Sequence, residues 1–319
     1  MNCLLTGGAG FIGSHLSERL LAQGQTVVNV DNFNDYYDPE IKRRNVAPLL
    51  RQSNYTLFEG DVLDRASLEK LFRDHKFEAI IHLAARAGVR PSIAQPLLYE
   101  KVNMEGTLNL LELARQTGVS KFIFGSSSSV YGENPKVPFS ESDPVDHPIS
   151  PYAATKKAGE QMCYTYHHLY GLRVSCLRFF TVYGPRQRPD MAIHKFTRMI
   201  ANGEKVPMYG DGSSKRDYTF VADIIDGIEA AIAHCNSYHI YNLGESRTID
   251  LKSLINLIQE YLGKKAVIEQ LPTQPGDVPI TFADISKAQR EIGYSPRVDI
   301  QEGVRRFVEW YKENHPVAS

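Results

Sequence analysis

The sequence predicts an α/β protein in which a doubly wound parallel sheet is followed by a smaller α/β domain. Two observations indicate this class. Apolar, β-rich runs alternate with amphipathic stretches through the first 180 residues, and a glycine-rich turn follows the first run directly. Strands that alternate with helices form right-handed βαβ units, whose strands lie parallel.

Six strands are expected in the first half, each a short run of apolar and β-branched residues. They cover residues 2–6, 26–31, 55–60, 79–84, 121–126 and 173–179. Stretches with helical periodicity lie between them, at residues 11–23, 65–75, 97–117 and 152–170. The strand at 79–84 is apolar through its centre, which is typical of a strand that helices cover on both faces.

The pattern changes after residue 180, where prolines punctuate shorter helices and loops. We interpret residues 1–180 as one domain and residues 181–319 as mainly a second, smaller domain that binds substrate. The division is expected to be discontinuous, because residues 239–244 resemble another sheet strand. A segment at about 212–244 would therefore return to the first domain.

Composition excludes several kinds of protein. Of 319 residues, 36 are Lys or Arg and 37 are Asp or Glu, which gives a formal net charge of −1. Such balance argues against broad electrostatic binding of nucleic acid or of an anionic membrane. No apolar run is long enough to span a bilayer, and the N-terminus lacks the pattern of a signal peptide.

The four cysteines are scattered, with no CxxC motif and no Cys/His cluster: Cys3, Cys163, Cys176 and Cys235. This spacing predicts neither a disulfide framework nor a zinc site, and no metal is expected. It fits a reducing compartment. We therefore expect a cytoplasmic protein.

The segment TGGAGFIG at residues 6–13 joins the first strand to the first helix. Backbone N–H groups at a helix N-terminus can hold a pyrophosphate, and glycine allows the backbone to approach it closely. The spacing GxxGxxG predicts a dinucleotide site contributed by Gly7, Gly10, Phe11, Ile12 and Gly13. A tight structural turn is the alternative.

Asp31 ends the second strand, where a carboxylate can accept hydrogen bonds from the hydroxyls of an adenosine ribose. No Arg or Lys follows before Lys42. We therefore expect no cation near enough to meet a 2′-phosphate, and NAD is favoured over NADP. Asp61 and Val62 follow the third strand and are expected beside the adenine, although Asp61 as a helix cap is an alternative.

Tyr152 and Lys156 are four residues apart in a predicted helix and therefore share one face. A nearby ammonium favours tyrosinate, which helps Tyr152 to act as a base. Tyr261 and Lys265 have the same spacing, but Gly263 sits between them near a helix end, with no companion motif. We interpret that second pair as structural.

Four serines, residues 126–129, come about 25 residues before Tyr152, where the strand at 121–126 ends. Doubly wound sheets bind their ligands at the carboxyl ends of the strands. A polar turn is the plain alternative for such a run. Its position between an apolar strand and the helix of Tyr152 and Lys156 favours a functional site.

Six motifs together resemble the extended short-chain dehydrogenase/reductase family, and within it the nucleotide-sugar epimerases. They cover nearly the whole chain in order: TGGAGFIG, HLAARAGVR, SSSSVYG, YAATK, KRDYTF and QPGDVP. The resemblance implies a Rossmann domain that binds NAD, a smaller C-terminal domain that binds a nucleoside-diphosphate sugar, and a homodimer.

Carried over by position, the resemblance makes Tyr152 the catalytic base and acid. Lys156 holds the nicotinamide ribose, and Ser127 hydrogen-bonds the sugar O4. Further cofactor contacts are implied for Asn32, Leu83, Ala84, Ala85, Asn103 and Phe179. Arg216 is implied near the diphosphate, and Asp277 near the nucleoside ribose. Phe179 as a core residue and Asn103 as a partner of the backbone remain alternatives.

Departures from the family pattern indicate the branch. Related sugar dehydratases and decarboxylases resemble one another in carrying acidic residues after the catalytic Ser or Thr, whereas Ser128 and Ser129 stand here. Hexose epimerases usually have Asn where this chain has Thr181. The string RFFTVYGPRQRPDM, with AGVRPS and QPGDVP, resembles UDP-glucuronate 4-epimerases. Arg90 and Arg188 are the candidate cations for the substrate, with a solvated surface position as the alternative for Arg90.

The expected reaction inverts C4 of UDP-glucuronate to give UDP-galacturonate through a transient 4-keto sugar. The hydroxyls of Ser128, Ser129 and Thr181 would hold the uronate carboxylate. One alternative is an epimerase for UDP-glucose or UDP-N-acetylhexosamine, and another is a nucleotide-binding protein without catalysis.

The helices at 97–117 and 152–170 are expected to pair with those of a second copy. They carry more apolar and aromatic residues than one buried stripe requires. Packing of both helices on their own sheet is the alternative.

Overall fold

The computed structural model describes residues 1–272 and 278–315, and its centre is a seven-stranded sheet. The order across the sheet is β11-β6-β5-β4-β1-β2-β3, and every neighbouring pair is parallel. The strands are β1 Asn2–Thr6, β2 Thr26–Asp31, β3 Tyr55–Glu59, β4 Ala79–His82, β5 Lys121–Ser127, β6 Arg173–Phe179 and β11 Tyr238–Leu243. The predicted doubly wound sheet is thereby confirmed.

The chain changes direction across the sheet at β1, which has β2 on one side and β4 on the other. Such a reversal leaves a crevice at the carboxyl ends of the strands, where doubly wound folds bind ligands. The glycine loop, the ends of β2 and β3, and the serines after β5 all lie at these ends. Sheet topology therefore gathers motifs that are far apart in the sequence.

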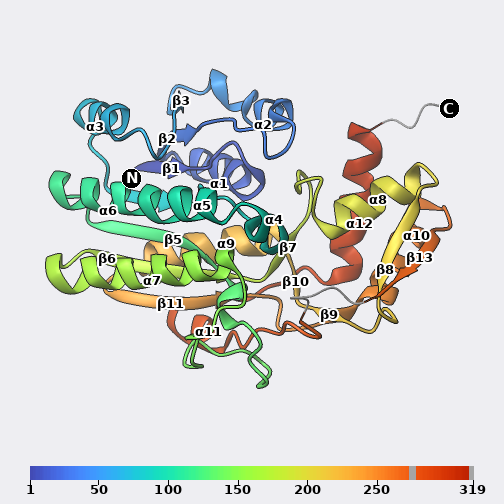
Figure 1. Cartoon of the computed structure of the whole chain (residues 1–319). Helices are drawn as coiled ribbons and strands as arrows, with labels where there is room; N and C mark the ends of the chain where they lie inside the picture. Colours follow the sequence, from blue (N-terminus) through green and yellow to red (C-terminus); the bar gives the residue numbers. More distant parts are fainter. Residues whose placement is uncertain (273–277, 316–319) are drawn as a thin grey trace.

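Helices cover both faces of the sheet, as the ribbon shows (Figure 1). Contacts link α1 Phe11–Ala22 with α2 Pro39–Val46 and α9 Val221–Ala233 on one face. On the other face, α6 Gly106–Thr117 contacts both α3 Arg65–Asp74 and α7 Pro151–Tyr170. Successive strand residues alternate between two buried clusters, so that Leu5 packs with α1 and Leu4 with α6.

The stretch predicted as one helix over 97–117 is interrupted, so that prediction was wrong in detail. It consists of α5 Pro96–Glu100, a π-helical turn η2 Lys101–Glu105 and α6, with α4 Val89–Ala94 before them. Within the turn, the carboxamide of Asn103 bonds the backbone of Arg86. Apolar periodicity continues through such a turn and cannot reveal it.

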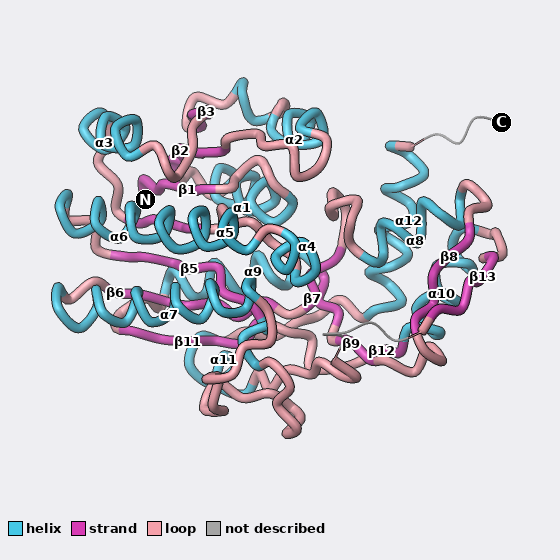
Figure 2. Tube along the Cα trace, viewed as in Figure 1, coloured by secondary structure: helices cyan, strands magenta, loops and turns pink. Residues whose placement is uncertain are grey.

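The second half adds three short two-stranded sheets (Figure 2). They pair β7 Thr181–Tyr183 with β10 Tyr218–Phe220, β8 Lys205–Tyr209 with β13 Val267–Leu271, and β9 Lys215–Arg216 with β12 Ile249–Asp250. The remaining helices are α8 Ala192–Ala201, α10 Leu251–Leu262, α11 Ser286–Ile292 and α12 Ile300–Asn314, and two short 3₁₀ turns are η1 Leu49–Arg51 and η3 Ser128–Tyr131. Within the described residues no helix is long and apolar enough to cross a membrane.

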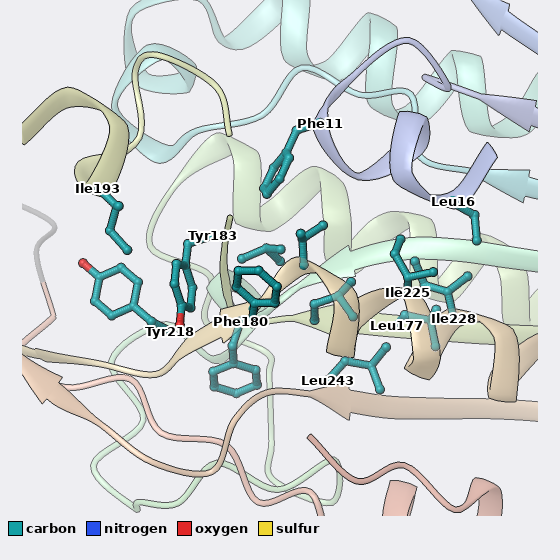
Figure 3. Packing of buried hydrophobic residues seen from close by; sticks show 14 of the residues in the cluster. Phe11, Leu16, Leu177, Phe180, Tyr183, Ile193, Tyr218, Ile225, Ile228 and Leu243 are labelled. Atoms are coloured by element: carbon teal, nitrogen blue, oxygen red, sulfur yellow. The ribbon is translucent and has the colours of Figure 1, made fainter. Parts of the chain in front are cut away.

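The two halves share one buried core. Figure 3 shows Phe180, Tyr183 and Tyr218 beside residues of the sheet and of α9. As the sequence predicted, the chain returns to the sheet late, because β11 is its seventh strand. The division into residues 1–180, about 212–244 and the rest stays a prediction.

Candidate active site

The glycine loop after β1 is packed too tightly for larger residues. Gly7 has a φ of +73°, and a Cβ there would lie 2.8 Å from the backbone nitrogen of Ala84. A Cβ on Gly13 would lie 2.3 Å from the carbonyl oxygen of Gly7. The narrow loop and the first turn of α1 border a cavity of ≈ 470 Å³. This geometry fits a pyrophosphate, which needs backbone N–H groups and close approach.

Asp31 lies at the edge of the same cavity, with its carboxylate already engaged. Its oxygens accept hydrogen bonds from the backbone N–H groups of Ala9 at 3.2 Å and Phe33 at 3.0 Å. The Nζ of Lys42 lies 3.4 Å from Oδ1, and both side chains are buried. The expectation that no cation lies near Asp31 was therefore wrong. Helix α2 packs back against α1 and carries Lys42 to the end of β2.

Nearly all the other cofactor candidates line this one cavity. They are Gly10, Phe11, Ile12, Asn32, Asp61, Val62, Leu83, Ala84, Ala85 and Phe179. Asn32 donates a hydrogen bond from Nδ2 to Asp61 Oδ2 at 2.7 Å. The cap of α3 is Asp64, whose Oδ1 accepts from the backbone of Ser67, so Asp61 is not that cap.

Asn103 is the exception, because it is not among the residues that line the cavity. Its Oδ1 accepts from the backbone N–H of Arg86 at 2.8 Å, and its Nδ2 donates to the Arg86 carbonyl and to Thr155 Oγ1. These contacts correspond to the alternative of a backbone partner. Asn103 fixes the segment after β4, whose residues Leu83, Ala84 and Ala85 do face the cavity.

Ser127 and Tyr152 both line this cavity. Ser127 is the last residue of β5, and its Oγ accepts from the backbone N–H of Ser129 at 3.2 Å, which starts the turn η3. Tyr152 lies in the first turn of α7, which Ser150 caps with a bond from Ala153 N–H. Burial raises the pKa of Tyr152, while a hydrogen bond with Ser127 and the charge of Arg188 act in the opposite direction.

Lys156 lies one turn further along α7 and is 5% exposed. Its ammonium donates to the carbonyl of Gly125 at 2.6 Å, near the end of β5. Burial lowers the pKa of Lys156 to about 8. The sequence argument expected Lys156 to stabilise tyrosinate, and the structure adds Arg188 as a cation that does so.

The candidate substrate residues divide between two cavities. Ser127, Ser128, Ser129, Thr181 and Arg188 line the first cavity, together with Tyr152. Arg90 and Arg216 line a second one of ≈ 220 Å³ with Lys195. Asp277, the remaining candidate, lies outside the described residues.

The second cavity combines positive charge with aromatic faces. Arg90 lies over the ring of Tyr209, 5.0 Å from its centre, and both residues line the cavity. Arg90 is thus a cavity residue and not only a solvated surface residue. Three basic side chains beside tyrosine rings suit an anionic, aromatic ligand portion such as a nucleoside diphosphate.

The sequence analysis missed a residue that is far from the catalytic candidates along the chain but lies near them in the structure. Tyr36 comes from the loop after β2, and its ring lies under the guanidinium of Arg188, at 5.3 Å. Arg188 also binds Asp190 through two hydrogen bonds of 3.0 Å. The one signal in the sequence was the pair of tyrosines, Tyr36 and Tyr37, in the segment NFNDYYDP.

The described residues contain no cluster of three or more His, Cys, Asp or Glu side chains able to hold a metal ion. The four cysteines are free and buried.

These features define a class. The protein has the features of a Rossmann-fold dehydrogenase or reductase. They are a doubly wound sheet, a glycine loop before α1, an acidic residue at the end of β2, and a Ser, a Tyr and a Lys that line one cavity. More particularly, the chain belongs to the family described as GDP-mannose 4,6 dehydratase, whose model matches residues 4–307. This family is part of the extended short-chain dehydrogenases/reductases.

Known proteins resemble the chain over its whole length. It is 44% identical to a UDP-glucuronate 4-epimerase of Thermodesulfobacterium geofontis over 98% of this chain and 96% of that protein. Among solved structures, UDP-glucuronic acid 4-epimerase of Bacillus cereus, in complex with UDP-glucuronic acid and NAD, superposes with a TM-score of 0.93 at 36% identity, covering 99% and 100% of the two chains. UDP-glucose 4-epimerase of Thermotoga maritima, with UDP-glucose, has a TM-score of 0.91 at 35% identity, covering 98% and 99%.

Proposed function

We propose that this protein is an NAD-dependent epimerase that inverts C4 of UDP-glucuronate to give UDP-galacturonate. The observation that carries the proposal is one cavity that holds the glycine loop and Asp31 at one end and Ser127, Tyr152 and Thr181 at the other. The relatives that are UDP-glucuronate 4-epimerases support this substrate.

The cofactor is held by the glycine loop at its pyrophosphate, by Asp31 at the adenosine ribose and by Lys156 at the nicotinamide ribose. When bound, NAD supplies a reversible hydride acceptor, so that C4 can be a ketone for part of each turnover. Tyr152 removes the proton from the O4 hydroxyl. It returns the proton after the sugar has rotated in the site to present its other face. Ser127 holds O4, and its hydroxyl acts to lower the pKa of Tyr152, which assists the ionisation of Tyr152.

Hydroxyl groups, rather than acids, face the remaining part of the sugar. Among the described lining residues the carboxylates are Asp31 and Asp61, both on the strand ends at the nucleotide side. Dehydration needs an acid beside the sugar, so the cavity favours epimerisation.

A 4-ketone lies β to the C5 carboxylate and makes loss of CO₂ easy. We propose that Ser128, Ser129 and Thr181 hold the carboxylate so that its C–C bond does not align with the ketone.

We propose that the nucleoside diphosphate binds at the second cavity, where Arg90 and Arg216 would supply positive charge. Arg188 lines the first cavity near Tyr152 and would meet the phosphate nearest the sugar or the uronate. Asp277 is retained as the candidate for the nucleoside ribose.

A neutral sugar is the second candidate substrate. The structural similarity to a UDP-glucose 4-epimerase favours it, since the same Ser, Tyr and Lys set serves either sugar. Incubation of purified protein with UDP-glucuronate, UDP-glucose and UDP-N-acetylglucosamine, followed by NMR of the C4 epimers, tests the proposal. Conversion of UDP-glucuronate is expected to be fastest. Faster conversion of a neutral sugar would replace the proposed substrate, and conversion of none would leave a nucleotide-binding protein.

We further propose a cytoplasmic homodimer. Apolar or aromatic side chains are exposed on the neighbouring helices α5, α6 and α7, at Leu97, Leu108, Tyr164, Leu169 and Tyr170. Two helices from each copy would bury them in a four-helix contact. A monomer mass by light scattering at micromolar concentration would contradict the dimer, and Leu97→Glu is expected to dissociate it.

A further inference from the structure

A buried polar cluster to which the proposed reaction assigns no role adjoins the serine turn, and one of its members, Ser126, also lines the first cavity. Glu160 of α7 and Arg178 of β6 have side chains that are each 1% exposed, and they are paired by hydrogen bonds of 2.8 and 2.9 Å. Ser126 of β5 donates from Oγ to the same carboxylate at 2.7 Å. Three elements are therefore joined at one carboxylate.

The cluster completes a regular set of contacts between α7 and β5. Tyr152, Lys156 and Glu160 are spaced by four residues and so lie along one helix face. Lys156 bonds the carbonyl of Gly125 and Glu160 bonds the next residue, Ser126, while Tyr152 lines the first cavity together with Ser127. The register of helix against strand is therefore defined by two hydrogen bonds, from Lys156 and to Glu160.

The contact with Ser126 also restrains the end of β5 at the cavity. Ser126 and Ser127 are consecutive residues there, and both line the first cavity with Tyr152. Because Ser126 is bonded to Glu160, the backbone that carries Ser127 is held in place. The helix approaches closely at this level, because a Cβ on Gly159 would lie 2.3 Å from the ring of Phe124.

Stability alone explains the buried pair poorly. Removing two charges from water costs about as much as their attraction returns, and apolar residues of similar volume are often equally stable. We propose that Ser126, Glu160 and Arg178 are positioning residues that fix the separation of Ser127, Tyr152 and Lys156. This inference rests on the proposed function only for its kinetic readout.

Ser126→Ala is the decisive variant, because it removes the hydroxyl and leaves the Glu160–Arg178 pair intact. Glu160→Gln would leave the Arg178 guanidinium buried without a counter-charge and is expected to impair folding. Ser126→Thr keeps the hydroxyl and is the rescue variant. Tyr294→Phe is the control for loss of a buried hydroxyl away from the site: this hydroxyl donates to the Gly244 carbonyl at 2.9 Å, and Tyr294 lines neither cavity.

Two measurements are made on the NAD-bound protein. In Ser126→Ala, amide hydrogen exchange of residues 125–131 is expected to be at least fivefold faster than in the parent. The kcat for UDP-glucuronate is expected to fall at least fivefold, while KM and the NAD content stay within twofold. Ser126→Thr and Tyr294→Phe should remain within twofold of the parent in kcat and in exchange at 125–131.

Unchanged exchange or unchanged kcat in Ser126→Ala overturns the inference, as does a loss that appears in KM or equally in Tyr294→Phe. If the parent protein does not epimerise UDP-glucuronate, the proposed function fails. The exchange comparison then still decides whether Ser126 holds the strand end.

Discussion

The ammonium of Lys42 lies 3.4 Å from the carboxylate of Asp31, and both side chains are buried at the edge of the cofactor cavity. In the sequence the two are eleven residues apart and looked unrelated. A carboxylate there suits the ribose hydroxyls of NAD, whereas a lysine freed from it would suit the 2′-phosphate of NADP. We therefore expect selection of the cofactor to depend on the pair rather than on Asp31 alone.

Asp31→Ala is expected to weaken NAD binding about tenfold or more, the usual cost of losing hydrogen bonds to a charged group. The same change leaves Lys42 without its partner carboxylate, so NADP binding should improve relative to NAD. Titration of each cofactor against the purified protein measures both effects. In Asp31→Ala/Lys42→Ala the relative gain for NADP should disappear; an identical NADP-to-NAD ratio in all three proteins would contradict the role of the pair.

Tyr152→Phe removes one hydroxyl at the junction of Ser127 and the substrate side of the cavity. Epimerisation is expected to fall by about 10³-fold or more, since the proton acceptor for O4 is lost. NAD content and thermal stability should remain near those of the parent. NMR of the C4 epimers provides the measurement, and turnover close to that of the parent would refute Tyr152 as the base.

Thr181→Ala tests recognition of the uronate. Thr181 begins β7 and lines the cavity near Ser128 and Ser129. If its hydroxyl bonds the carboxylate, kcat/KM for UDP-glucuronate should fall roughly tenfold more than kcat/KM for UDP-glucose. Equal losses on the two sugars would place Thr181 at a part of the nucleotide that both substrates share.

The buried ammonium of Lys156 predicts a pH dependence of NAD binding. Burial lowers its pKa to about 8, so the side chain is charged at pH 7 and loses its proton as the pH rises through 8. If the charged form holds the nicotinamide ribose, affinity for NAD should weaken about tenfold between pH 7 and pH 9. Lys156→Met should bind weakly with no such change. A flat profile in the parent would exclude the ammonium as a contact.

Glu245 predicts a pH dependence of stability. It is 8% exposed, its Oε2 has no hydrogen-bond partner among the described residues, and burial with the nearby charges of Asp223 and Asp217 raises its pKa to about 7. The folded state therefore binds this proton more tightly than the unfolded state, so its contribution destabilises the protein above pH 7 and improves as the pH falls through 7 toward 4.5.

Glu245→Gln, which is neutral throughout, should be more stable than the parent by ~1–2 kcal/mol at pH 8, and this advantage should shrink by pH 5. Thermal melts at the two pH values measure it. Glu313→Gln, at an exposed position of α12, serves as the control and should follow the parent. A constant difference between Glu245→Gln and the parent at both pH values would contradict the raised pKa.

The parallel sheet and much of the site could be predicted because local patterns determine them. The alternation of strands and helices predicted the positions of the first six strands along the chain and their parallel pairing, and the glycines of residues 6–13 predicted the loop. Tyr152 and Lys156 share a helix face because of their spacing alone. Each of these inferences depends on residues that are close in the sequence, where backbone geometry decides which side chains meet.

What the sequence by itself determined was the class of fold, the glycine loop and the identity of the candidate groups at the strand ends. Only the tertiary structure decided which of them meet. In the structure Lys42 lies beside Asp31, and Asn103 bonds the backbone of Arg86. Arg90 and Arg216 line a different cavity from Tyr152. Glu160 bonds both Ser126 and Arg178. The physical reason is that these contacts join elements whose relative placement follows from hydrophobic packing on a common sheet. The spacing of polar residues along the chain does not specify that packing.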